Sequence, residues 1–248
     1  MEPQSLSGKT ALVTGSARRV GAAIVNELHR LGAHVVIHYR NSAEDALALQ
    51  QSLLQVRPDS ASTVQGDLLD DSCHARLIAA AIAATGRLDI LVNNASNYYP
   101  TLIGGVTAAH WDDLMGINAR APFFLAQAAA PLLRVHHGCI VNLVDIHATR
   151  PNKDFTVYSM AKAANAMMVK ALARELAPEI RVNGVAPGAI LWPEAEDGDY
   201  DASSVLERIP LGRAGDPVDI AHTVAFLARS GYITGHIIPV DGGRTTQQ

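Results

Sequence analysis

The stretch TALVTGSARRVG, from Thr10 to Gly21, decides the expected fold. The residues from Thr10 to Thr14 are β-branched or apolar, which predicts a buried strand, and apolar residues spaced three and four apart from Val20 to Leu31 predict a helix. The turn between them contains Gly15. A strand that passes through a glycine turn into a helix is the context in which backbone N–H groups bind the phosphates of a dinucleotide.

The rest of the chain repeats this alternation of short apolar runs with longer amphipathic stretches. We expect strands at residues 10–14, 34–39, 62–67, 88–95, 138–144, 180–188 and 236–243, and helices at 20–31, 42–56, 71–85, 108–133, 156–176 and 218–229. Strands that are apolar on both faces need helices on both sides. The sequence therefore predicts an α/β protein: one Rossmann-fold domain over residues 1–248, with a seven-stranded parallel sheet covered by helices on both faces.

The composition excludes several classes of protein. The chain has 248 residues, 48% of them hydrophobic, and its net charge of −4 with no basic stripe argues against a nucleic-acid partner. Cys73 and Cys139 lie far apart, which favours free thiols, and the histidines show no metal-binding spacing. No apolar run approaches ~18 residues and the N-terminus lacks a signal segment, so we expect a soluble, cytoplasmic protein with no membrane partner.

Three arginines near the ends of the first two predicted strands indicate which cofactor is bound. An NAD site usually carries an acidic residue at the end of its second strand, where it binds the ribose hydroxyls. Here that end is HYRNS, His38 to Ser42, and no carboxylate follows until Glu44. Arg18, Arg19 and Arg40 could instead surround a 2′-phosphate. We therefore expect NADPH rather than NADH.

The ends of the later strands complete the predicted cofactor site. Asp67 is placed to accept a hydrogen bond from the adenine amino group, and NNAS, residues 93–96, to pack along the ribose. The residues expected to bind the cofactor are Gly15, Arg18, Arg19, Val20, Gly21, His38, Tyr39, Arg40, Asn41, Ser42, Asp67, Leu68, Asn94, Ala95, Ser96, Tyr158, Lys162, Pro187 and Gly188.

Tyr158 and Lys162 are four residues apart and so share one face of a predicted helix. An ammonium group close to a phenol favours the phenolate, and we expect Lys162 to lower the pKa of Tyr158 from about 10 toward the working range. Tyr158 is then a proton donor for a reduction, and Lys162 can also hold the ribose hydroxyls.

The chain resembles the short-chain dehydrogenase/reductase family over essentially its whole length, through the TGxxxRxG turn, NNA, Asn118, the YxxxK pair and Pro187-Gly188. The resemblance implies a homotetrameric oxidoreductase in which Asn118 helps to hold a water relay behind the lysine. It also implies that AILWPEAEDGDYDASS, residues 189–204, covers the substrate. Leu191 and Trp192 are the large apolar side chains of this stretch, although Trp192 could instead belong to the core or to a subunit interface.

One position departs from the family pattern. Asp145 stands thirteen residues before Tyr158, where the family usually has a serine. In this it resembles the pteridine reductases within the family. The NNASNYYP stretch agrees, with Tyr98 where an aromatic ring stacks on the pterin and Ser96 within reach of pterin and cofactor. Arg19 stands where those enzymes place an arginine near cofactor phosphate and pterin, and HYRNSAEDA resembles their cofactor-selecting segment, with the basic residue shifted by one position.

A carboxyl group at position 145 suits the reduction of a C=N bond better than that of a C=O bond. A ketone needs hydroxyl donors at its carbonyl oxygen, and a carboxylate there would repel the developing oxyanion. A pterin instead presents a C=N bond, whose reduction needs a proton at nitrogen, and a carboxylic acid can supply that proton through Tyr158 or water. The alternative is that Asp145 only caps the local backbone.

These residues predict an NADPH-dependent reductase of the C=N bond of dihydropterins, such as dihydrobiopterin or dihydromonapterin, with dihydrofolate as a further candidate. The expected catalytic residues are Asp145, Tyr158, Lys162 and Asn118, and the expected substrate-binding residues are Arg19, Ser96, Tyr98, Asp145, Tyr158, Leu191 and Trp192. Two alternatives stay open: an ordinary carbonyl reductase acting on ketones or 3-oxoacyl thioesters, and a non-catalytic protein that senses NADPH.

Overall fold

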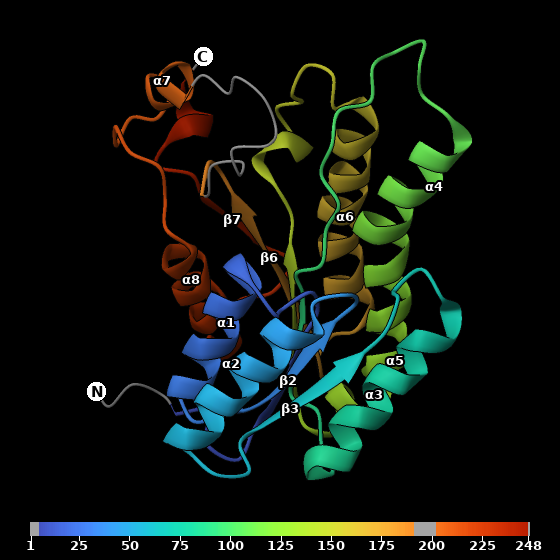
Figure 1. Cartoon of the computed structure of the whole chain (residues 1–248), viewed down its shortest axis with the longest axis vertical. Helices are drawn as coiled ribbons and strands as arrows, with labels where there is room; N and C mark the ends of the chain where they lie inside the picture. The colour runs from blue at the N-terminus through green and yellow to red at the C-terminus, as the bar shows by residue number, and fades with distance from the viewer. Residues whose placement is uncertain (1–4, 191–201, 248) are drawn as a thin grey trace.

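The computed structural model describes residues 5–190 and 202–247, and one parallel sheet runs through them (Figure 1). Its strands are β1 (Thr10–Val13), β2 (His34–Tyr39), β3 (Ala61–Gln65), β4 (Ile90–Asn93), β5 (Cys139–Leu143), β6 (Arg181–Pro187) and β7 (Ile237–Val240). The strand order is β3-β2-β1-β4-β5-β6-β7 and every pairing is parallel. The predicted seven-stranded α/β fold is confirmed.

Helices cover both faces of the sheet. They are α1 (Arg19–Arg30), α2 (Ala43–Val56), α3 (Asp71–Thr85), α4 (Ala108–Met115), α5 (Ala121–Val135), α6 (Thr156–Glu175), α7 (Ala202–Leu206) and α8 (Pro217–Arg229). One core layer lies between the sheet and α1, α2 and α8, and a second lies between the sheet and α3 and α5. Among the described residues no helix is long and apolar enough to cross a membrane.

The apolar strands follow from these two layers. In β1, Ala11 and Val13 pack into the layer with α1 and α8, whereas Leu12 packs into the layer with α3 and α5. Alternate residues of a strand point to opposite faces, so a strand covered on both sides must be apolar throughout.

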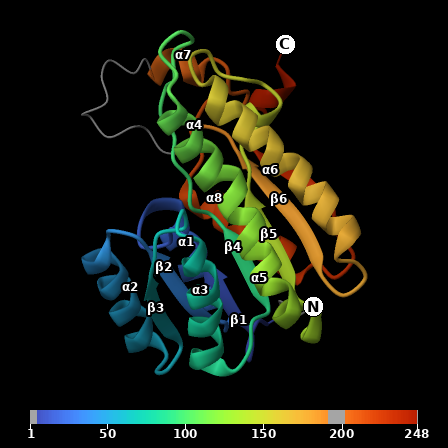
Figure 2. The ribbon, with the colours of Figure 1, turned by 90° about the vertical axis from the view of Figure 1, so that its right-hand side faces the viewer.

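The long helix expected at residues 108–133 is interrupted. A π-helical turn, η1 (Gly116–Arg120), separates α4 from α5, although Figure 2 shows the two helices as one continuous rod beside α6. Pro122 lies at the start of α5 and has no N–H group for an i−4 bond. Helix α7 was not expected either, because a five-residue helix has too few positions to show a period.

The order in which the chain adds strands to the sheet reverses between β1 and β4. The chain moves outward from β1 through β2 to β3, and then crosses to β4 on the other side of β1. Loops that leave β1 and β4 therefore diverge at their carboxyl ends, which is where doubly wound sheets bind ligands.

Candidate active site

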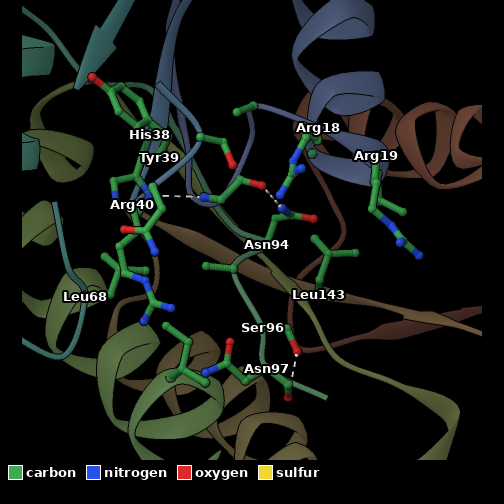
Figure 3. Close-up of a pocket in the computed structure, with 18 of the residues that line it drawn as sticks. Arg18, Arg19, His38, Tyr39, Arg40, Leu68, Asn94, Ser96, Asn97 and Leu143 are labelled. Atoms are coloured by element: carbon green, nitrogen blue, oxygen red, sulfur yellow. Dashed lines mark hydrogen bonds between the residues drawn. The ribbon is translucent and has the colours of Figure 1, made fainter. Parts of the chain in front are cut away.

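A cavity of about 510 Å³ lies at this reversal point. Figure 3 shows residues from several strand ends around it: Arg18 and Arg19 where the glycine turn enters α1, Tyr39 and Arg40 at the end of β2, and Asn94 and Ser96 after β4. The predicted cofactor residues that line it are Gly15, Arg18, Arg19, Val20, Gly21, His38, Tyr39, Arg40, Asn41, Ser42, Asp67, Leu68, Asn94, Ala95, Ser96, Tyr158, Lys162 and Pro187. Asp145 lines it as well.

Other predicted residues lie elsewhere. The Gly188 N–H donates to the Val240 carbonyl oxygen at 2.9 Å, and a Cβ on Gly188 would lie 2.7 Å from the Cβ of Asp241. Gly188 is therefore a glycine because it packs closely against the end of β7, and it is not among the described residues that line the cavity. Leu191 and Trp192 lie outside the described residues.

Sequence reasoning missed several lining residues: Ala17, Gly66, Asn97, Ile117, Leu143 and Val144. Leu143 and Val144 stand at the end of β5, so the rule that strand ends meet at one edge could have found them. Ile117 comes from the π-helical turn, which leaves no periodic signal.

The two turn glycines are required by the protein's own packing. Gly15 has a φ of +58°, and a Cβ there would lie 2.9 Å from the Cα of Ala95. A Cβ on Gly21 would lie 2.5 Å from the carbonyl oxygen of Gly15. These glycines let the turn approach the loop after β4 and let α1 approach the turn.

The start of α1 fits an anionic ligand. Its N-cap residue, Arg18, makes no side-chain capping hydrogen bond. Arg19 follows with a φ of +53°, a left-handed conformation that costs a non-glycine residue about 1–3 kcal/mol. Both residues line the cavity. Helix N-termini bind anions through backbone N–H groups, so these residues fit the pyrophosphate of a dinucleotide.

His38 supports the glycine turn from behind. Its Nδ1 accepts a hydrogen bond from the Gly15 N–H at 3.0 Å, and its Nε2 donates to the Gly66 carbonyl oxygen at 3.1 Å. Burial lowers the pKa of His38 to about 4, so the ring is neutral at pH 7. Both ring nitrogens are engaged within the protein, and His38 therefore borders the cavity without a free polar atom to offer a cofactor.

The end of the cavity near β2 carries loosely paired charges. Arg18 Nε lies 3.6 Å from Asp45 Oδ2, and Arg40 Nη1 lies 3.9 Å from Asp67 Oδ2. All four side chains are between 46% and 65% exposed. Exposed pairs of this kind contribute about 0–1 kcal/mol, so a phosphate group can compete with these carboxylates for the arginines.

Asp145 and Tyr158 meet at the other end of the cavity. The Tyr158 O–H, in the first turn of α6, donates to Asp145 Oδ2 at 2.7 Å. The second oxygen of the same carboxyl group, Oδ1, accepts the His147 N–H at 2.8 Å. Asp145 thus caps the local backbone, as the alternative supposed, and faces the tyrosine at the same time.

The surroundings of Tyr158 keep it protonated. Burial, followed by the charge and hydrogen bond of Asp145, raises the pKa of Tyr158 well above its usual value. The expected lowering by Lys162 is therefore wrong here. Lys162 Nζ lies 5.7 Å from the centre of the Tyr158 ring and donates to the Leu143 carbonyl oxygen at 2.9 Å.

Lys162 is itself enclosed, with 2% of its surface exposed. Burial lowers the pKa of Lys162 to about 8, while the charge of Asp145 acts in the opposite direction. The lysine is thus mainly charged at pH 7 and loses its proton slightly above it.

The loop after β4 places Tyr98 beside Tyr158. The Tyr98 ring stacks on Phe155 with centroids 4.4 Å apart and meets the Tyr158 ring edge-on at 4.8 Å. Its neighbour Tyr99 donates its O–H to Asp113 Oδ2 at 2.8 Å, which anchors the loop to α4. Tyr98 is half-exposed at the edge of the site, and Phe155, which the sequence reasoning missed, supports its ring.

Asn118 lies in the π-helical turn and bridges two segments. Its Oδ1 accepts the Ser96 O–H at 2.6 Å, and its carbonyl oxygen accepts from Asn165 Nδ2 at 2.8 Å. No hydrogen bond between described residues joins Asn118 to Lys162, so a part for Asn118 in a relay behind the lysine stays a prediction. Across the described ranges, no group of three or more His, Cys, Asp or Glu could hold a metal ion.

A parallel sheet with a dinucleotide-type turn at its reversal point and a buried Tyr-Lys pair at a nearby strand end defines the class, a Rossmann-fold oxidoreductase. Residues 15–245 match the model of a family described as Enoyl-(Acyl carrier protein) reductase. The chain belongs to the short-chain dehydrogenase/reductase family, whose reductases use NAD(P)H.

Several curated relatives are similar over nearly their full length. The chain is 37% identical to Pteridine reductase 1 of Leishmania tarentolae, with 96% of this chain and 97% of the relative covered. It is 36% identical to the 3-oxoacyl-[acyl-carrier-protein] reductase FabG of Staphylococcus aureus, with 95% and 97% covered. An uncharacterized oxidoreductase of Mycobacterium tuberculosis is 35% identical, with 97% and 93% covered. These near-equal identities establish an oxidoreductase of this family and leave the substrate to be argued from the site.

Proposed function

We propose that the protein is an NADPH-dependent pteridine reductase that reduces the C=N bond of dihydropterins, with dihydrofolate as a further substrate. The observation that carries the proposal is the 2.7 Å hydrogen bond from the Tyr158 O–H to Asp145 Oδ2, at the position where the family usually has a serine. The identity with Pteridine reductase 1 of Leishmania tarentolae supports it.

The proton route follows from this hydrogen bond. Burial and Asp145 raise the pKa of Tyr158, so the tyrosine keeps its proton until a substrate nitrogen takes it. Asp145, which accepts the Tyr158 O–H as a carboxylate, can then take up a proton from solvent and return it to Tyr158 along the same bond. One proton thereby reaches nitrogen for each hydride that reaches carbon. A ketone would instead develop negative charge on oxygen beside a carboxyl group, which is unfavourable when that group is ionised.

The cofactor's part is limited to the hydride that reduced nicotinamide supplies when it is bound. Arg18 and Arg40 would hold the 2′-phosphate that distinguishes NADPH from NADH, and the open start of α1 would hold the pyrophosphate. Lys162 would hold the ribose hydroxyls next to Tyr158.

The substrate would lie beside the loop after β4. Tyr98 offers an aromatic edge next to Tyr158, which suits a flat heteroaromatic ring, and Ser96 lines the same cavity. Arg19, at the start of α1, also lines it. We further expect a homotetramer, as the family resemblance implies, and a cytoplasmic location, as the sequence predicts.

The test is NADPH oxidation followed by absorbance, with dihydrobiopterin, dihydrofolate and an acetoacetyl thioester in parallel. Turnover of dihydrobiopterin with little or none of the thioester supports the proposal. Turnover of the thioester alone would assign the protein to the carbonyl reductases, which the similarity to FabG favours as the second candidate. NADPH binding without any turnover would favour a sensor.

A further inference from the structure

A line of buried amide side chains runs from the centre of the sheet toward the cavity. Asn93 Nδ2 donates to Asn142 Oδ1 at 2.8 Å, and Asn142 Nδ2 donates to Asn165 Oδ1 at 2.9 Å. Asn165 Nδ2 then donates to the Asn118 carbonyl oxygen at 2.8 Å, and the Ser96 O–H donates to Asn118 Oδ1 at 2.6 Å. None of the four asparagines is more than 4% exposed, so water does not compete for these bonds.

A main-chain carbonyl fixes which amide atoms in this line donate hydrogen bonds and which accept them. The Asn118 carbonyl oxygen can only accept, so Asn165 must turn its amide nitrogen toward it and its amide oxygen toward Asn142. Pro122 is the residue whose N–H would bond to this carbonyl in a regular α-helix, and proline has none. The interrupted helix thus leaves an acceptor that Asn165 satisfies.

The direction of the hydrogen bond between Ser96 and Asn118 follows from the same kind of argument. Asn118 Nδ2 donates to the carbonyl oxygens of Asn97 and Leu114, both at 3.0 Å, so its Oδ1 must face Ser96. The Ser96 O–H makes its shortest hydrogen bond to that oxygen, at 2.6 Å, and a longer one of 3.5 Å to the Asn97 carbonyl oxygen. Toward the cavity, Ser96 is therefore left with the lone pairs of its own oxygen, which accept hydrogen bonds.

We infer that Asn165 is a positioning residue: by donating to the Asn118 carbonyl oxygen it holds the main chain of the π-helical turn, and thereby the place from which Asn118 Oδ1 binds the Ser96 O–H. The Ser96 oxygen is then held as a hydrogen-bond acceptor for an N–H group of the substrate. The inference rests on the proposed function, because a pterin carries N–H donors and a 3-oxoacyl group carries none at its reacting end. Asn165 lies one turn after Lys162 on α6 and is not among the described residues that line the cavity, so it acts through its neighbours.

A double-mutant cycle of Ser96→Ala and Asn165→Ala tests this, with kcat/KM for dihydrobiopterin as the readout. We expect Ser96→Ala to lower kcat/KM about 10-fold, the effect of one lost hydrogen bond of ~1.4 kcal/mol, and Asn165→Ala to lower it by a similar or smaller factor. The double variant should be no slower than Ser96→Ala alone, because both changes remove the same contact. Effects that multiply would overturn the inference, since Asn165 would then act independently of Ser96.

Asn183→Ala is the matched control. Asn183 is 1% exposed, donates to the Ile233 carbonyl oxygen at 2.8 Å and accepts the His236 N–H at 3.1 Å, away from the line of asparagines. It should lower the melting temperature as a buried amide loss does, while kcat/KM of the folded enzyme changes less than about 2-fold. If kcat/KM falls as far as in Asn165→Ala, the effect of Asn165 is general destabilisation and the inference fails.

A replacement variant and a second substrate separate failure of this inference from misfolding and from failure of the proposed function. If Asn165→Ala does not fold, Asn165→Leu, which is close in shape and makes neither bond, replaces it in the same cycle. A wild-type protein that reduces the thioester but no pterin would overturn the proposed function and the N–H assignment. The cycle run on the thioester would then decide whether Asn165 still acts through Ser96.

Discussion

The two ends of the cavity are built differently. Near β2, Arg18 and Arg40 reach their carboxylate partners only at 3.6 and 3.9 Å, and they remain about half exposed or more. At the chemical end, Tyr158 and Lys162 are 3% and 2% exposed and make hydrogen bonds of 2.7 and 2.9 Å.

Solvent explains why this contrast matters. Water and salt screen the exposed charges, so each arginine adds only a modest preference for a phosphate. The buried groups have no such screening: burial and Asp145 both shift the pKa of Tyr158 upward, and burial shifts that of Lys162 downward against the opposing charge of Asp145. Cofactor choice is therefore expected to change gradually with substitution, and chemistry to change steeply.

The steepest loss should follow Tyr158→Phe, which removes the proton donor and leaves the ring. We expect kcat to fall about 10³-fold, within the usual range for a general acid, with NADPH affinity changed less than about 3-fold. Stopped-flow kinetics and fluorescence titration measure the two quantities. If kcat stayed above a tenth of the wild-type value, another group would have to supply the proton.

Gly21→Ala tests whether every substitution at the cofactor end of the cavity has a small effect. Its Cβ would lie 2.5 Å from the Gly15 carbonyl oxygen, and overpacking of this kind costs about 1–3 kcal/mol of unfolding free energy. Gly231→Ala is the matched control, because nothing lies within 4 Å of a Cβ there. Urea denaturation of both variants gives the comparison, and equal stabilities would show that the turn is not packed as described.

Lys162 should limit activity at high pH. Because burial places its pKa at about 8, kcat/KM for NADPH should fall above that pH, by about 10-fold for each unit. Lys162→Arg keeps its charge and should lack this fall, although its rate is lower. Asp145→Ser should move the fall to lower pH, since Asp145 raises the pKa of Lys162. If kcat/KM for NADPH fell above the same pH in Lys162→Arg, the titrating group would be one other than Lys162.

The smallest effect is expected at the exposed arginines. Arg40→Ala should raise KM for NADPH about 5-fold, as loss of ~1 kcal/mol would do, and leave KM for NADH unchanged. The difference should shrink as salt is added. Arg134→Ala removes a comparable surface pair, 3.7 Å from Glu179, and serves as the control. Equal changes for both cofactors would mean that Arg40 does not contact a 2′-phosphate.

Much of this could be predicted from the sequence, because strand ends of a parallel sheet meet at one edge. The strand periodicity placed the glycine turn, the loop after β4 and Asp145 on that edge, and the cavity brings them together. The π-helical turn could not be predicted, since it depends on where Pro122 and Asn165 meet Asn118 in space. The direction of the Tyr158 pKa shift could not be predicted either, because burial and the 2.7 Å contact with Asp145 raise this pKa, whereas the sequence suggested that Lys162 would lower it.

The central claim is that Asp145 makes this site a reductase of C=N bonds. The most direct measurement compares wild type, Asp145→Asn and Asp145→Ser by kcat/KM on dihydrobiopterin and on an acetoacetyl thioester, with NADPH saturating. Both variants should lose about 100-fold on dihydrobiopterin, because neither an amide nor an alcohol can bind a proton and release it as a carboxylic acid does, and Asp145→Ser should gain relative activity on the thioester. Undiminished pterin reduction in Asp145→Ser would contradict the account.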